Sequence, residues 1–232
     1  MAKHSPELPS GFDIKTYLLA RFLGKDADVL FIENTDYERL KQVQSVLNIK
    51  ITIMNTDFDE LEKAHNLGFE VINGNANTEN MFNIKNKSFN YVVAENIISS
   101  TRYPGDFIKN CARIGEFVVL SNHNMGHWRK RLKFLFSGSN YVHNQYDIFP
   151  DDKDAWFNKN PWFLSHKDIV NLCACQSLTI KKGTMIYPNG VIDNIYDMRA
   201  YPNLKAEDVY YLISDEDIAS PSYVIGGTKA IS

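Results

Sequence analysis

The feature that most constrains the fold is a regular alternation of short apolar runs with amphipathic stretches over the first half of the chain. The apolar runs have the length and composition of buried strands, and they cover residues 28–32, 49–54, 69–72, 88–93 and 116–121. The intervening stretches carry apolar side chains at spacings of three and four, as in residues 36–47, which is typical of amphipathic helices. Such an alternation implies right-handed crossovers, and it predicts an α/β fold: a doubly wound, mostly parallel sheet with helices on both faces.

The rest of the chain predicts further elements around this sheet. Helices are expected at 12–23, within an N-terminal helical segment 1–24, and at 59–67, 104–111, 127–136 and 165–175, with strands near the end of the chain. Gly68 follows the second of these helices and is a candidate C-cap. Residues 137–164 form an aromatic and acidic insertion. A length of 232 residues suits a single domain, which we expect to span 1–232.

Charge and cysteine content exclude several classes of protein. The net charge of −3 gives no overall field that would draw the chain to nucleic acid or to a membrane. Three cysteines without a C-x-x-C pair suggest neither a disulfide framework nor a zinc site, and we expect no metal. The first ten residues are polar, and no apolar run approaches the length of a membrane span. The sequence therefore predicts a cytoplasmic protein.

The turn after the first predicted strand is the first place to look for a ligand, because open parallel sheets bind ligands at the carboxyl ends of their strands. A glycine-rich turn there would let the backbone approach a nucleotide-like ligand. Residues 33–37 read E-N-T-D-Y and contain no glycine. An acidic residue is expected after each of the next two strands, yet the chain has Asn55 and then Asn75. The candidate cofactor-contacting residues are Glu33, Asn34, Asp36, Asn55, Asn75 and Glu95, the last at the end of the fourth predicted strand.

Several segments of the sequence resemble the MetW family, a branch of class I methyltransferase-like proteins named for methionine biosynthesis. The most specific is N-M-G-H-W-R-K-R-L at 124–132, which is close to the family's N-x-G-H-W-R-x-R-L. Shorter matches lie at 88–93 (S-F-N-Y-V-V), 101–104 (T-R-Y-P), 112–115 (A-R-I-G) and 202–207 (P-N-L-K-A-E). The resemblance runs in register from about residue 28 to residue 212. It implies a Rossmann-like class I fold that binds S-adenosylmethionine.

The chain departs from this family pattern at the positions that should hold the cofactor. The family turn V-L-D-L-G-C-G-x-G falls on residues 29–37, where its three glycines become Glu33, Thr35 and Tyr37 and its acidic residue becomes Phe31. The expected ribose carboxylate falls on Asn55 and the acidic position after the third strand on Asn75. A carboxylate hydrogen bond contributes roughly 1.5–3 kcal/mol, so losing one or two weakens binding about ten- to several-thousand-fold. A Cβ at the glycine positions is also expected to exclude the left-handed backbone that glycine permits.

The G-H-W-R segment is the second candidate site. His127, Trp128, Arg129 and Arg131 could bind a substrate or a partner, since arginine clamps carboxylates or phosphates, tryptophan stacks and histidine transfers protons. The alternative is a structural helix with Trp128, Leu132 and Leu135 facing inward and its basic side chains solvated. Residues 147–162 combine four aspartates with large aromatic side chains. They suit either a lid or partner-docking loop, or an ordinary loop folded over the core.

Two main functions follow from these observations. The first is a non-catalytic MetW-like subunit, a pseudoenzyme of methionine or related small-molecule metabolism that self-associates or binds a protein; the resemblance implies a homoserine O-acyltransferase as that partner. The second is an S-adenosylmethionine-dependent methyltransferase with a rebuilt pocket, which needs no fixed catalytic residue because methyl transfer depends mainly on positioning. A third is another metabolite held by Asn55, Asn75 and Asp36. No catalytic residue is assigned: His123 could be a base, but no glycine-flanked nucleophile accompanies it.

Overall fold

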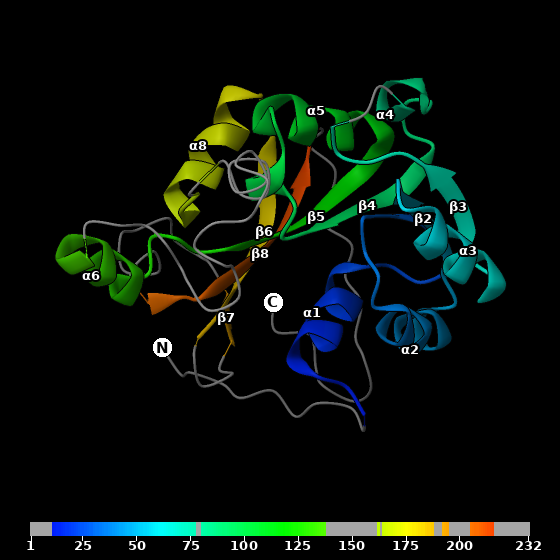
Figure 1. The fold of residues 1–232 in the computed structure, drawn as a ribbon, viewed down its shortest axis with the longest axis horizontal. Coiled ribbons are helices and arrows are strands. Elements are labelled where there is room, and N and C mark those ends of the chain that lie inside the picture. The colour runs from blue at the N-terminus through cyan, green and yellow to red at the C-terminus, as the bar shows by residue number, and fades with distance from the viewer. Residues whose placement is uncertain are drawn as a thin grey trace, which may run out of the picture.

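The strands of the protein form one continuous sheet. The structure is a computed structural model that describes residues 11–77, 80–137, 162, 164–187, 192–194 and 205–215. Within these residues, eight strands lie in the order β3-β2-β1-β4-β5-β8-β6-β7 (Figure 1). Their bounds are β1 Asp28–Ile32, β2 Lys50–Asn55, β3 Glu70–Asn73, β4 Phe89–Glu95, β5 Gly115–His123, β6 Thr179–Ile186, β7 Ile192–Asn194 and β8 Asp208–Ser214.

The sheet is parallel in its first part and antiparallel in its last. The five strands from β3 to β5 pair in parallel, each within a residue or two of its predicted position. β8 is antiparallel to both β5 and β6, and β6 is antiparallel to β7. The predicted fold class is therefore confirmed, and the strands expected near the end of the chain extend the sheet beyond β5.

Helices connect the strands and cover both faces of the sheet. They are α1 Ile14–Phe22, α2 Tyr37–Leu47, α3 Phe58–Asn66, α4 Asn80–Asn83, α5 Pro104–Ile114, α6 Trp128–Ser137 and α8 His166–Cys175, with a 3-10 turn, η1, at Ile98–Ser100. All but α4 and η1 were predicted. Each of these two spans about one turn, which is too short to show an apolar periodicity.

Successive strand residues point to opposite faces, and this alternation divides the core in two. In β1, Val29 and Phe31 belong to a buried cluster shared with α1, α2 and α3. Leu30 and Ile32 belong to a second buried cluster shared with α5 and α8. Figure 1 shows the first group of helices on one side of the sheet and α4, α5 and α8 on the other.

The helix termini follow local sequence signals. Asp13, Asp36 and Asp57 are the N-caps of α1, α2 and α3, and each side-chain carboxylate accepts hydrogen bonds from backbone N–H groups of the first turn. Ser165 caps α8 in a capping box with Asp168. Gly68, the predicted stop signal, takes a φ of +83° just after α3, a conformation that residues with a side chain rarely adopt.

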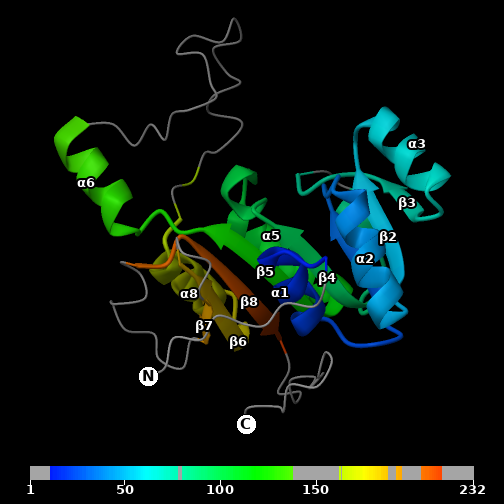
Figure 2. The ribbon, with the colours of Figure 1, turned by 90° about the horizontal axis from the view of Figure 1, so that it is seen from below.

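The helix α6 stands apart from the rest of the fold. Figure 2 shows it extending beyond the carboxyl end of β5, away from the layers formed by the sheet and the other helices. The 147–162 segment lies outside the described residues except for Trp162, whose indole N–H donates to the carbonyl of Thr101 at 2.9 Å. No helix in the described part of the chain is long and apolar enough to cross a bilayer.

Candidate functional site at the carboxyl edge of the sheet

The order of the strands reverses between β1 and β4, because β1 leads outward to β2 and β4 leads outward to β5. The carboxyl ends of these parallel strands, at Ile32, Asn55 and Glu95, therefore meet along one edge. Such a reversal is where open α/β sheets bind their ligands. The predicted cofactor-contacting residues all lie along this edge or in the turns that follow it.

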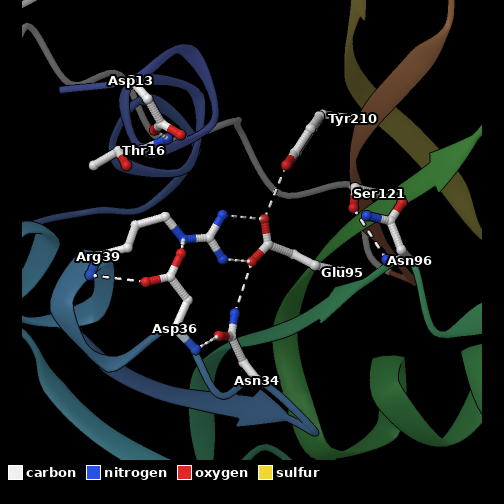
Figure 3. Close-up of polar contacts among 9 residues, drawn as sticks. All are labelled: Asp13, Thr16, Asn34, Asp36, Arg39, Glu95, Asn96, Ser121 and Tyr210. Atoms are coloured by element: carbon white, nitrogen blue, oxygen red, sulfur yellow. Dashed lines mark hydrogen bonds and ion pairs between the residues drawn. The ribbon is translucent and has the colours of Figure 1, made fainter.

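Glu95 is the centre of a polar cluster at this reversal (Figure 3). Its Oε1 accepts hydrogen bonds from the Tyr210 hydroxyl at 2.9 Å and from Arg39 Nη1 at 3.2 Å. Its Oε2 accepts from Asn34 Nδ2 at 2.8 Å and from Arg39 Nη2. A carboxylate offers about four acceptor positions, so these four donors use the whole capacity of Glu95.

The Arg39–Glu95 ion pair is largely shielded from solvent, with side-chain exposures of 11% and 9%. Burial works against the charged guanidinium, but the Glu95 carboxylate outweighs it and raises the pKa of Arg39 above its ordinary value. Burial and then the Glu95 charge raise the pKa of Tyr210 well above that of a free phenol. Arg39 therefore stays charged and Tyr210 stays a proton donor at any physiological pH.

Glu33 makes a second contact along the same edge. It stands at the first lost glycine position and takes a φ of 53°, so the expectation that a side chain would exclude the left-handed backbone there is wrong. Two hydrogen bonds hold this conformation: Glu33 N–H donates to the carbonyl of Met54 at 2.8 Å, and Ala76 N–H donates to Glu33 Oε1 at 3.0 Å. Because β2 lies between β1 and β3, the Glu33 side chain reaches across the carboxyl end of β2.

The two asparagines that replace the expected acidic residues turn toward the backbone. Asn55 is 8% exposed, and its Oδ1 accepts a hydrogen bond from Asp57 N–H at 3.0 Å. Asn75 Oδ1 accepts from Asn77 N–H at 2.9 Å. Both contacts are typical of asparagine side chains that stabilise a turn two residues ahead. Asp36 likewise caps α2, with its Oδ2 3.6 Å from Arg39 Nε.

Two members of the Glu95 cluster, Arg39 and Tyr210, were not predicted from the sequence. Arg39 did leave a signal: it is a cation in the first turn of a helix, where the helix dipole disfavours positive charge. Such a placement suggests a nearby anion, but periodicity does not reveal which one. Tyr210 gave no signal, because a tyrosine in a buried strand looks like a core residue.

The G-H-W-R segment lies elsewhere, at the start of α6. His127 is buried, and its Nδ1 accepts from Arg129 N–H at 3.3 Å. Trp128 is 45% exposed and has the Arg129 guanidinium 5.4 Å from its ring centroid. Arg131 Nε donates to the carbonyl of Gly126 at 2.7 Å. The structure therefore keeps the two predicted sets of residues apart.

The inward-facing alternative for this helix is wrong. Trp128 and Leu132 are 45% and 41% exposed, and Leu135 and Phe136 are 72% and 83% exposed. No described side chain of α6 belongs to either buried cluster. The basic side chains are not simply solvated either, since Arg131 is bonded to the backbone and Arg129 lies over an aromatic ring.

Asn124, the first residue of the N-x-G-H-W-R motif, holds the base of α6 in place. Its buried side chain accepts hydrogen bonds from the backbone N–H groups of Gly126 at 3.0 Å and His166 at 3.1 Å, and it donates to the carbonyl of Ala206 at 2.9 Å. One amide therefore connects the starts of α6 and α8 with Ala206, two residues before β8. This explains in structural terms why the motif begins with asparagine.

His123, which the sequence offered as a possible base, is the last residue of β5. Its Nδ1 pairs with the carboxylate of Asp208, the first residue of β8. Burial opposes the charge on Asp208, but the His123 contact outweighs it and lowers the pKa of this carboxyl. No serine or cysteine nucleophile contacts His123 in the described contacts. Among the described residues, no group of three or more His, Cys, Asp or Glu side chains is arranged to hold a metal ion.

Comparison with known proteins supplies the family. The sequence model of the family described as methionine biosynthesis protein MetW matches residues 16–213. The chain belongs to the MetW family. The match extends from α1 through β8 and so includes both the Glu95 cluster and α6. The comparison with curated proteins found no match to the sequence.

Several solved structures with the same fold are methyltransferases. An S-adenosylmethionine-dependent methyltransferase of Thermotoga maritima, described as a possible histamine N-methyltransferase, is 14% identical, with a TM-score of 0.55 over 87% of this chain and 93% of its own. A methyltransferase-like protein of Bacillus halodurans is 12% identical, with a TM-score of 0.56 over 88% and 98%. A Haloferax volcanii protein solved with the Trm112 methyltransferase activator is 9% identical, with a TM-score of 0.56 over 87% and 88%. At these identities the likeness establishes the fold of this MetW protein.

Proposed function

We propose that this MetW-family protein is a non-catalytic cytoplasmic subunit whose S-adenosylmethionine site has been closed by its own side chains, and that it acts by binding another protein. The observation that carries the proposal is the filled hydrogen-bonding capacity of Glu95. Arg39, Asn34 and Tyr210 occupy all its acceptor positions at the point where the strand order reverses.

The hydrogen bond from Ala76 N–H to the Glu33 side chain supports a closed site at the part of the edge formed by β2 and β3. The Glu33 side chain crosses the carboxyl end of β2, beside Asn55, where a carboxylate would hold ribose hydroxyls in a working site. A nucleoside would have to break this contact and would then meet the neutral Asn55 and Asn75. Both halves of the site therefore present satisfied polar groups instead of free acceptors.

A protein partner fits the family and the fold. The MetW resemblance points to a homoserine O-acyltransferase in methionine or related metabolism. One protein of the same fold, from Haloferax volcanii, was solved in complex with an activator protein. Partnership between a methyltransferase-like fold and a second chain is therefore physically reasonable here, whether that chain is an acyltransferase or a second copy.

Calorimetric titration with S-adenosylmethionine and with its demethylated product tests the closed site. We expect no heat and no thermal shift at millimolar ligand, with a catalytic class I methyltransferase as the positive control. Micromolar or tighter binding would contradict the proposal and favour a methyltransferase with a rebuilt pocket. Mass spectrometry of the purified protein covers the third possibility, because another metabolite in the site would co-purify.

Binding of the acyltransferase is tested separately. The two purified proteins, the acyltransferase taken from the same organism, are mixed and separated by size-exclusion chromatography with light scattering, which reports the mass of any complex. We expect a stable complex. Two separate peaks at micromolar concentration, together with tight binding of S-adenosylmethionine, would overturn the non-catalytic reading.

A further inference from the structure

The described face of α6 is unusual because it exposes large apolar side chains on a helix that packs against neither core cluster. Trp128, Leu132, Leu135 and Phe136 recur at spacings of four, three and one. With 3.6 residues per turn, these positions fall within roughly 100° of the helix circumference. Exposed apolar patches of this kind mark interaction sites on soluble proteins.

The base of α6 is rigid, which suits a binding element. Asn124 fixes the backbone of Gly126, and Arg131 Nε donates to the carbonyl of the same glycine. His127 is 2% exposed and anchors the first turn through Arg129 N–H. The helix is therefore held by a network of hydrogen bonds at one end and presents its apolar side chains at the other.

The charge of α6 indicates what kind of surface it fits. Its sequence, W-R-K-R-L-K-F-L-F-S, contains four basic residues and no acidic residue. A groove that accepts this helix needs apolar walls for the four anchors and acidic side chains at its rim. Helices that dock in this way place their anchors at i, i+3, i+4 and i+7, and Trp128, Leu132 and Leu135 lie at the i, i+4 and i+7 positions of that pattern.

The same charges argue against two other occupants. In a symmetric dimer through α6, the two helices would face each other, and their basic side chains would be brought together. Stable binding to an anionic membrane relies on clusters of about four to eight free basic residues. Here Lys130 is half-buried near Glu207 and Asp208, and Arg131 is bonded to Gly126.

We infer that α6 is the docking helix of this protein, and that it inserts Trp128, Leu132, Leu135 and Phe136 into an apolar groove with an acidic rim on a different protein. The inference rests on the proposed function and specifies it, because it assigns the binding of the partner to one helix. The Glu95 cluster takes no part in the interface.

The test measures the affinity of the wild-type chain and of two variants for the homoserine O-acyltransferase by biolayer interferometry. Leu135→Asp/Phe136→Asp removes the two most exposed anchors, and Arg129→Glu reverses a rim charge. The matched control is Phe58→Asp, because Phe58 is 73% exposed at the start of α3, far along the sheet from α6. Circular dichroism confirms that each variant is folded.

We expect the double variant to bind at least about 30-fold more weakly, as for the loss of interface hot spots, whereas Phe58→Asp binds like the wild type. Arg129→Glu should weaken binding about tenfold at low salt and less at high salt. Equal binding by all variants would overturn the docking helix and leave the proposed function standing. Absence of binding by the wild type would overturn the docking helix and would remove the acyltransferase as the partner, while the closed site is judged separately by the titration with S-adenosylmethionine.

Three further measurements distinguish the other occupants of this face. Sedimentation of the wild-type chain and the double variant reports self-association through α6, and vesicles of phosphatidylcholine with phosphatidylserine report membrane binding. Hydrogen exchange of the isolated monomer reports whether the chain itself covers α6. A dimer or vesicle binding that the double variant abolishes, or strong protection of α6 in the monomer, would overturn the inference; rapid exchange that slows in the complex supports it.

Discussion

The carboxyl edge of the sheet and the helix α6 differ in how far their side chains are buried and bound within the protein. At the edge, the carboxylate of Glu95 is buried and every acceptor position is used by Arg39, Asn34 and Tyr210. On α6, Leu135 and Phe136 are 72% and 83% exposed. At the edge where this fold class binds ligands, the protein's own side chains already supply the hydrogen bonds of Glu95. On α6, by contrast, large apolar side chains remain exposed to water.

The proposed function rests on this difference. A carboxylate whose hydrogen bonds are complete gains little from a ligand, because any new contact requires an existing one to be broken. An exposed apolar side chain gains free energy from any partner that removes it from water. We therefore propose that binding of a partner is driven by α6, and that the edge contributes to the stability of the fold. Four experiments test this contrast.

The largest effect is expected from Arg39→Met, which leaves the Glu95 carboxylate buried without its cation. Removing one partner of a buried ion pair costs about 3–5 kcal/mol of unfolding free energy. Urea denaturation followed by circular dichroism measures this loss. The matched double variant, Arg39→Met/Glu95→Gln, should recover much of it, since no charge is then left unpaired. A loss below about 1 kcal/mol, as for an exposed pair, would show that the edge is open to water.

The second effect concerns pH and the base of α6. Burial lowers the pKa of His127 and of His166 below the ordinary histidine value. As pH falls below about 6.5, the unfolded chain takes up protons that the folded chain resists, so the free energy of unfolding decreases. Each histidine contributes a slope of up to about 1.4 kcal/mol per pH unit between its unfolded and folded pKa values.

Unfolding experiments at pH 7.5, 6.5 and 5.5 measure this slope, and His166→Gln should flatten it. Replacing His127 as well should flatten it further, because the two side chains are not in contact in the described hydrogen bonds. A stability that stays constant from pH 7.5 to 5.5 would show that both imidazoles reach water. In that case His127 and His166 would be exposed to water in the folded chain, and the base of α6 would be less buried than the structure shows.

A smaller effect is expected from the helix caps. Asp36→Ala removes the cap of α2, and Asp57→Ala removes the cap of α3. Each should cost about 1 kcal/mol, the usual value for an N-cap. Asp36→Ala should cost somewhat more, because Asp36 also lies 3.6 Å from Arg39 and helps to orient it toward Glu95. Equal losses by thermal or chemical denaturation would show that Asp36 does not support the ion pair.

The smallest effect on stability is expected from α6 itself. Leu135→Ala should change the unfolding free energy by less than about 0.5 kcal/mol, because the side chain is already exposed. The same substitution at Leu212, which is 1% exposed in β8, should cost about 2–5 kcal/mol. A large loss at Leu135 would contradict the contrast between the two regions, since it would mean that this face is covered in the folded chain.

The sequence anticipated the parts of the molecule that depend on local pattern. The apolar runs at 28–32 and 116–121 lie in β1 and β5. A short, nearly continuous apolar run is typical of a strand whose two faces are both covered by helices. Gly68, the predicted C-cap, took a left-handed conformation just after α3. These features depend on a few neighbouring residues, so the local sequence is sufficient to predict them.

The site was harder to predict because its residues meet through tertiary contacts. Glu33 and Asn34 were recognised from their place after a strand, yet their partners, Ala76 and Glu95, lie 43 and 61 residues away. The sequence also could not show which way the apolar stripe of α6 faces. The spacing of Trp128, Leu132 and Leu135 in the sequence is the same whether these side chains pack on a core or remain exposed.

The sequence by itself determined the doubly wound sheet, the loss of the three turn glycines and the presence of a basic, apolar helix after β5. Only the tertiary structure decided that Arg39 and Tyr210 converge on Glu95, across separations of 56 and 115 residues, and that α6 leaves the body of the protein. The physical reason is that strand order and register bring the ends of β1, β4 and β8 together. No local pattern encodes that order.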